Sequence, residues 1–329
     1  MRTKAPSRLG AVLLLLGGLV FSPASGAAPD PPPLSLRAGK ADSPYHTLAI
    51  ELVAALSQQG GQAPAIAVEE SQGSVQNVID AAQEPAPRLF TAPPNVISDA
   101  RHGDKPFGKN PHYADVRALF PIPFQTMHWV VRKDADIKSF DDLAGHPFVP
   151  GGRGSFGEQQ TETVLKLLGL EDRVQLIDID SNAAASALSS KQIAGFATSG
   201  SYPIASLATL AKETPIRLLS LTSAQVEQEL KSDGTTVSAT IPKGTYPGVD
   251  EDTKTVALPA GIYTTRRLSN DDAYRITKTF WTNLPALVQN APAWGAVTPA
   301  LLSVLRARLH PGALKYYLEA GIEVPAKLR

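Results

Sequence analysis

The feature that most constrains the fold is a recurring unit: a short apolar strand, a polar turn rich in Gly or Ser, and then a helix. The first hundred residues contain it twice, with strands expected at 34–38 and 65–68 and apolar residues at helical spacing after each. A further copy spans residues 146–165. Because successive strands joined through a helix run in the same direction, the repeat predicts an α/β protein with a parallel sheet.

The chain has 329 residues, a length that favours two lobes over a single hydrophobic core. Strands expected at 127–132 and 256–264 are placed to cross between the lobes. We expect residues 28–133 to begin the first lobe, residues 134–252 to form the second, and residues 253–329 to return to the first. Such an arrangement brings the helix-opening turns of both lobes to one cleft, where ligands of open α/β sheets bind.

The N-terminal residues have the pattern of a secretory signal peptide. Three basic residues precede an apolar run at 9–21, and small residues follow at 23–28. The run is short for a ~30 Å bilayer, which disfavours an uncleaved anchor. We expect residues 1–27 to be removed by cleavage near residue 27 and the mature protein to be periplasmic.

Composition argues against several classes of partner and chemistry. The chain has 31 basic and 31 acidic residues, a formal net charge of +0, and no block of like charge, so nucleic acid and anionic membranes are poor partners. It has no Cys and six His without an H-E-x-x-H pattern. Arg153 stands where a G-x-S-x-G nucleophile turn around Ser155 needs a glycine. We therefore expect no metal, no cofactor and no catalytic residues.

Residues 152–157 nevertheless spell G-x-G-x-x-G, and Asp178 and Asp180 follow about twenty residues on, as in dinucleotide-binding turns. This leaves an exported NAD-type oxidoreductase as an alternative. The same turn suits a carboxylate, because a helix start presents free N–H groups and a positive dipole end. Arg153 would add a charge-assisted pair with the carboxylate. A tight turn without a ligand and a surface or inter-lobe ion pair of Arg153 are the structural alternatives.

Residues 241–252 (IPKGTYPGVDED), followed by TVALP at 255–259, resemble the solute-binding subunits of TAXI-type TRAP transporters. Segments 71–74, 137–145 and 200–203 fit the same family in the same order. The similarity extends from about Leu34 to Leu284 and therefore covers most of the mature chain.

The resemblance implies a two-lobed periplasmic binding protein of type II, a Venus-flytrap in which each lobe is a sheet flanked by helices and crossing strands form the hinge. It implies capture of a small carboxylate or amino acid, such as glutamate, glutamine or 2-oxoglutarate, by lobe closure. The solute would pass to a TRAP-type membrane permease without catalysis, and we expect a monomer. A receptor that feeds a membrane sensor is the alternative within this class.

The candidate ligand-binding residues lie at the helix-opening turns. They are Tyr45, Gln72, Ser74, Arg153, Gly154, Ser155 and Tyr202. Ser74 has a second interpretation as a helix N-cap. Asp42 would repel a carboxylate unless it meets an α-ammonium, which favours an amino acid. The turn at 40–44, the strand end at 91–94, Arg153 and Phe156 depart from the family pattern, so the ligand need not be the usual one.

Overall fold

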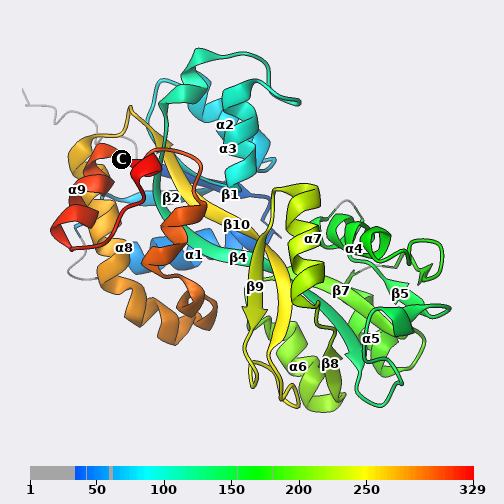
Figure 1. Ribbon diagram of the computed structural model, residues 1–329. Helices are drawn as coiled ribbons and strands as arrows, with labels where there is room; N and C mark the ends of the chain where they lie inside the picture. The colour runs from blue at the N-terminus through cyan, green and yellow to red at the C-terminus, as the bar shows by residue number, and fades with distance from the viewer. Residues whose placement is uncertain (1–33, 42, 59–61, 154, 180) are drawn as a thin grey trace, which may run out of the picture. The chain divides into compact units, whose positions relative to one another are not determined.

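The computed structural model describes residues 34–41, 43–58, 62–153, 155–179 and 181–329 (Figure 1). The expected signal peptide lies outside the described residues, and so do Asp42, Gly154 and Asp180. Residues 33–329 belong to one compact unit.

The described residues form ten strands of one sheet, in the order β2-β1-β3-β10-β4-β7-β5-β6, with β8 also paired to β4 and β9 to β10. The strands are β1 (Leu34–Gly39), β2 (Ile66–Glu70), β3 (Arg88–Ala92), β4 (Val116–Arg132), β5 (Pro147–Val149), β6 (Gln175–Leu176), β7 (Gly195–Gly200), β8 (Ile216–Leu218), β9 (Val237–Ile241) and β10 (Thr253–Thr265). The pairs β1–β2, β1–β3, β5–β6 and β5–β7 are parallel, whereas β4 and β10 run antiparallel to their neighbours.

Helices flank this sheet. The α-helices are α1 (Pro44–Leu56), α2 (Ser74–Gln83), α3 (Pro94–His102), α4 (Phe156–Leu167), α5 (Ser181–Ser189), α6 (Ala205–Glu213), α7 (Ser223–Asp233), α8 (Asn270–Asn290) and α9 (Pro311–Glu319). Short 3₁₀ turns are η1 (Pro111–Asp115), η2 (Asp141–Leu143), η3 (Pro292–Ala296), η4 (Pro299–Val304) and η5 (Ala326–Leu328). None of the described helices is long and apolar enough to span a membrane.

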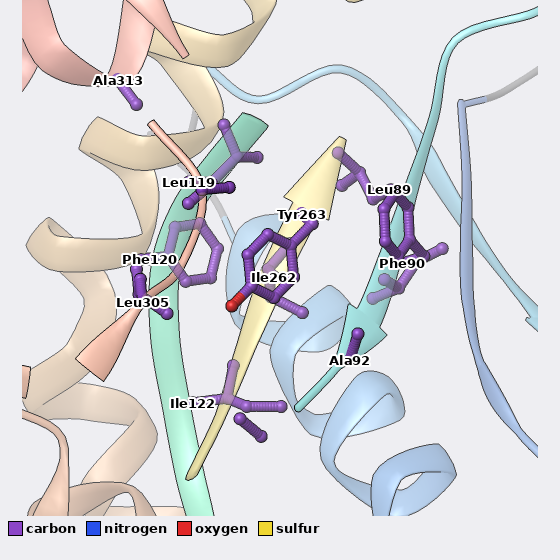
Figure 2. Packing of buried hydrophobic residues seen from close by; sticks show 14 of the residues in the cluster. Leu89, Phe90, Ala92, Leu119, Phe120, Ile122, Ile262, Tyr263, Leu305 and Ala313 are labelled. Atoms are coloured by element: carbon purple, nitrogen blue, oxygen red, sulfur yellow. The ribbon is translucent and has the colours of Figure 1, made fainter. Parts of the chain in front are cut away.

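Buried apolar residues divide between two lobes. One cluster takes its members from residues 36–122 and 260–328, and Figure 2 shows part of it, with side chains of β3, β4 and β10 packed together. Two further clusters lie within residues 127–256, one beneath α4 and α7 and the other beneath α5 and α6. The predicted α/β fold class with two lobes is confirmed by this arrangement. The boundaries placed after residues 133 and 252 remain predictions.

The strands β4 and β10 belong to both lobes (Figure 1). They pair with each other in antiparallel register from Ala257↔Thr126 to Thr265↔Val116. The strand predicted at 127–132 is only the final third of β4, which has 17 residues. The shorter prediction ignored the segment from Val116 to Thr126, where two prolines interrupt the usual strand pattern.

Other element predictions differ from the structure in instructive ways. The apolar run at 174–179, which has the pattern of a strand, forms only the two-residue strand β6, and both residues are exposed, so little burial stabilises it. Strand β9 was not predicted: its sequence, VSATI, alternates apolar and polar residues, but the run is only five residues long and only Ile241 is fully buried. Helix α8 continues through Pro285, although proline inside a helix removes a backbone hydrogen bond.

Candidate ligand site

The middle of β4 is less buried than the rest of that strand. Along β4, residues Val116 to Val131 are buried except Phe124 and Gln125, which are half-buried. On β10, Leu258 is half-buried inside an otherwise buried run, and it pairs directly with Gln125. On β7, Ser199 is half-buried and pairs with Met127, which lies two residues after Gln125 on β4. We name Gln125, Ser199 and Leu258, which share one face of the sheet, the mid-sheet patch.

The mid-sheet patch lies where the cores of the two lobes meet. On β4 the first-lobe cluster ends at Ile122 and the second-lobe clusters begin at Met127. The Ser199 hydroxyl donates to Oε1 of Gln125 over 3.4 Å, which joins the end of β7 to the crossing strand. Gln125 was not predicted, because a polar side chain among apolar residues marks a polar position but does not reveal which strands lie beside it.

Tyr45, a predicted site residue, lies next to this patch. It sits in the first turn of α1, which begins at Pro44 after the N-cap Ser43, whose hydroxyl accepts from the backbone N–H of His46. Burial raises the pKa of Tyr45 above its ordinary value, and the neighbouring Gln125 side chain lowers it in part. The Tyr45 hydroxyl makes no hydrogen bond of good geometry among the described residues, so a buried polar group lacks a partner here.

The turn between β2 and α2 contains Gln72 and Ser74. Gly73, with φ 116°, is the N-cap of α2, and no side chain caps the helix. The interpretation of Ser74 as the N-cap is therefore wrong: Ser74 is the first helical residue, and the left-handed backbone required at the cap position favours glycine. Gln72 is exposed, and the hydroxyl of Ser71 accepts from the N–H of Gly73. The start of α2 thus keeps its orphan N–H groups without a side-chain acceptor among the described residues.

The turn before α4 is built around a glycine outside the G-x-G-x-x-G pattern. Gly151 has φ 135°, and a Cβ there would lie 2.7 Å from the backbone nitrogen of Glu158 and 2.9 Å from the carbonyl carbon of Gly157. Ser155 is the N-cap of α4, and its hydroxyl accepts from the N–H of Glu158 over 3.2 Å. The close strand-to-helix approach accounts for glycine at this turn without a nucleotide.

Arg153 is exposed on this turn and forms an ion pair with Asp178, which is also exposed. The contact with Asp178 raises the pKa of Arg153. Arg153 was expected to pair with a ligand carboxylate, and Asp178 was the acid placed for a ribose hydroxyl. In the structure their side chains neutralise each other instead. Gly154, the remaining predicted residue of the turn, lies outside the described residues. Phe156 is partly buried and packs against the second-lobe core.

Tyr202 lies after β7, half-buried, and burial raises the pKa of its phenol. It lines a cavity of about 140 Å³ together with Phe124 and Thr126 of β4, Ser238 of β9 and Ala296 of η3. Phe124 and Thr126 alternate with Gln125 along the strand, so this cavity lies on the opposite face of the sheet from the mid-sheet patch.

A buried hydrogen-bond chain supports the turn that carries Tyr202. The N–H of Ile204 donates to the hydroxyl of Tyr246 over 2.9 Å, and that hydroxyl contacts Nε2 of His128 over 2.9 Å. Nδ1 of His128 lies 3.0 Å from the carbonyl oxygen of Thr126, which can only accept. The neutral Nδ1–H tautomer of His128 satisfies every link. Burial lowers the pKa of His128 to about 4, in keeping with a structural histidine.

The structure thus brings Tyr45 to the mid-sheet patch through Gln125. Within the described residues, no hydrogen bond or ion pair links Gln72, Ser74, Arg153 or Ser155 to the patch or to one another. No group of three or more His, Cys, Asp or Glu among the described residues is arranged to hold a metal ion.

A family model described as the NMT1-like family matches residues 37–321. The chain belongs to the NMT1-like family. Among solved structures, this NMT1-like chain is similar to R. palustris Rpa4515 with adipate, at 18% identity and a TM-score of 0.50, over 88% of this chain and 93% of that chain. That likeness shows a shared fold.

Two further structures align with the NMT1-like chain. A TctC solute binding protein from Polaromonas aligns at 12% identity and a TM-score of 0.49, over 80% of this chain and 86% of that chain. The periplasmic binding protein BugD aligns at 14% identity and a TM-score of 0.48, over 89% of this chain and 99% of that chain.

Proposed function

We propose that this NMT1-like protein is a periplasmic solute-binding protein that captures a small carboxylate or amino acid by closure of its lobes. Its ligand would be of the glutamate, glutamine or 2-oxoglutarate type, passed to a TRAP-type permease of the TAXI kind, and the protein would be exported and act without catalysis as a monomer. The observation that carries this proposal is the mid-sheet patch, a half-buried group of two polar side chains and one apolar side chain at the point where two cores share one strand.

The chemistry of the patch suits a small polar ligand. The Gln125 amide offers donors and an acceptor, Ser199 offers a hydroxyl, and the buried Tyr45 hydroxyl makes no hydrogen bond of good geometry among the described residues, although Gln125 lies next to it. A ligand that bonds these groups replaces unmet hydrogen bonds, which are expensive to leave in a water-poor site. Leu258 supplies an apolar surface for the carbon chain of the ligand.

The helix-opening turns contribute the anion preference. Parallel strands β1, β2, β5 and β7 end at these turns, and the start of α2 keeps N–H groups free for a carboxylate. The dipole of an exposed helix start stabilises an anion by only ~0.3–1 kcal/mol, whereas micromolar capture requires about 8 kcal/mol. Lobe closure must therefore supply most of the affinity by excluding water.

Arg153 remains in the proposed site, with Asp178 as the competitor for its guanidinium. A carboxylate ligand would have to replace Asp178 when the lobes close. If it does, we expect Arg153→Ala to weaken carboxylate binding by about tenfold or more. Unchanged affinity would assign Arg153 to the surface ion pair alone.

The proposal is tested by isothermal titration calorimetry and thermal shift with glutamate, glutamine, 2-oxoglutarate, adipate and NAD. Adipate is included because Rpa4515 was solved with it. A carboxylate at a hundredfold excess over its Kd should stabilise the protein by about 2.7 kcal/mol. Gln125→Ala should weaken binding at least about tenfold, and Gln192→Ala, an exposed glutamine of the second lobe, should leave it unchanged. Stabilisation by NAD alone would favour the oxidoreductase alternative and overturn the proposal.

The partner is tested separately from the ligand. If the protein serves a permease, removal of the gene should abolish uptake of the identified solute by the cell. If uptake persists and only the transcriptional response to the solute is lost, the protein feeds a membrane sensor.

A further inference from the structure

Four arginines from distant parts of the chain surround one cavity in the first lobe. The cavity measures about 290 Å³ and is lined by Arg101, Ala114, Arg117, Arg266 and Arg308. Arg101 lies at the end of α3, Arg117 at the start of β4, Arg266 just after β10, and Arg308 before α9. We call this the arginine cavity.

The positive charge of the arginine cavity is poorly compensated. Asp115 contacts Arg266 over 3.6 Å, and it is shared with His112 over 3.4 Å. Among the described residues, Arg101, Arg117 and Arg308 have no carboxylate within ion-pair distance. The whole chain has a formal net charge of +0, so four guanidiniums beside one carboxylate are a local concentration, not a general property of the surface.

Two of the guanidiniums are held in place by the backbone. Nη1 of Arg117 donates to the carbonyl oxygens of Ala114 (2.8 Å) and Val116 (2.7 Å), and this side chain is only 6% exposed. Arg101 donates from Nη1 to the carbonyl of Arg306 and from Nη2 to that of Val116. Its buried Nε has no described partner. Fixed guanidiniums with donors left over are preorganised for an oxygen-rich anion.

The other two arginines stand at the rim. The Arg266 side chain is 65% exposed and Arg308 is also exposed, in contrast with the recessed Arg117. Burial and the neighbouring guanidiniums of Arg266, Arg101 and Arg308 lower the pKa of Arg117, because both effects disfavour its charged form. A ligand that brings several negative charges into the cavity would relieve this repulsion.

We propose that the arginine cavity binds a small multivalent oxyanion of the phosphate class, apart from the mid-sheet patch. A phosphate group has three or more acceptor oxygens and carries more negative charge than a monocarboxylate, so it can accept forked hydrogen bonds from more guanidiniums at once. The recessed position of Arg117 favours a ligand that enters the cavity over a flat surface that only touches the rim. The phosphate belongs to a free anion and not to a phospholipid headgroup.

The test titrates the purified protein with inorganic phosphate and with pyrophosphate by calorimetry, with sodium chloride added to hold ionic strength constant. We expect saturable binding that is tighter for pyrophosphate. The rim double variant Arg266→Gln with Arg308→Gln, which leaves the backbone-bonded arginines intact, should weaken it about tenfold or more. Arg173→Gln, an exposed arginine of the second lobe with no described ion pair, is the matched control and should change affinity less than about twofold.

Three outcomes would overturn the proposal. The first is no binding of either anion to the unchanged protein. The second is an equal loss of affinity in the Arg173→Gln control, which would indicate general screening of charge. The third is binding to phosphatidylglycerol vesicles without binding of free phosphate or pyrophosphate, which would make the cavity part of a membrane-facing surface. Circular dichroism melting of each variant verifies that the fold is retained.

Discussion

At the scale of single residues, His128 connects the stability of the fold to pH. Its folded-state pKa of about 4 lies below the unfolded value of 6.5, so the unfolded chain binds more protons between these values. The stability that neutral His128 contributes is fully present above pH 6.5 and is lost as the pH falls toward 4. Full loss corresponds to about 3 kcal/mol.

Urea unfolding at pH 7 and pH 4.5 measures this dependence. We expect the free energy of unfolding of the unchanged protein to fall by about 2 to 3 kcal/mol more than that of His128→Gln, because the variant has no imidazole to protonate. Other groups, including His310, whose pKa burial also lowers, contribute equally to both proteins. An identical pH dependence in the two proteins would contradict the assignment of His128 as a buried neutral residue.

Gly151 gives a second residue-scale prediction. Alanine there combines a positive φ with contacts of 2.7 and 2.9 Å to the backbone at the start of α4, so Gly151→Ala should destabilise the protein by about 2 kcal/mol or more. Gly108→Ala is the control, since its new methyl group meets nothing within 4 Å. Equal midpoints of urea unfolding for the two variants would show that the close turn is not required.

Of the candidate site, Tyr45 was predicted from the sequence and Gln125 was not, for physical reasons. Turn residues such as Tyr45 could be predicted because polar residues follow apolar runs where parallel strands end. Gln125 was not, since its role depends on which strand lies beside it. A surface ion pair of Arg153 was among the expected alternatives, but its partner Asp178 was not predicted, because 25 residues separate the two along the chain.

At the scale of elements, the contact between α8 and α9 depends on one glycine. A Cβ on Gly312 would lie 2.0 Å from the carbonyl oxygen of Asn270 and 2.8 Å from the nitrogen of Tyr274. We expect Gly312→Ala to force the helices apart and to cost roughly 3 kcal/mol, measured by urea unfolding. Gly295→Ala in η3, where the nearest atom is a flexible Val288 methyl group at 3.4 Å, should cost much less. Comparable losses would contradict the close packing of α8 on α9.

Many helices have local sequence signals, such as capping residues and prolines, at the positions where they begin. Helix α7 begins with a capping box of Thr222 and Gln225, and α1, α3 and α9 each have proline in the first turn. Helices α3 and α7 were not predicted despite these signals, and the missed strands are ones that neighbouring strands decide. Strand β9 is held by β10, and the first part of β4 by the antiparallel β10 beside it.

At the scale of the whole molecule, shared strands predict cooperative unfolding. The cores of the two lobes both contain residues of β4 and β10, so neither lobe can lose these strands without disturbing the other. We expect one thermal transition by scanning calorimetry, with equal calorimetric and van't Hoff enthalpies. Two resolved transitions would show that the lobes unfold as separate units.

The pairing of β4 with β10 has a consequence for the engineering of the chain. Ile122 lies opposite Ala260, so everything between them is an excursion from what would otherwise be a plain β-hairpin. Replacing residues 123–259 by a two-residue Asn-Gly turn places the paired residues Ile122 and Ala260 on either side of the turn and leaves the whole first-lobe cluster in sequence. The second lobe is thus an insertion between two paired positions of the first lobe. Replacing it by a related second lobe at the same two positions offers a route to new ligand specificities while the first lobe is kept.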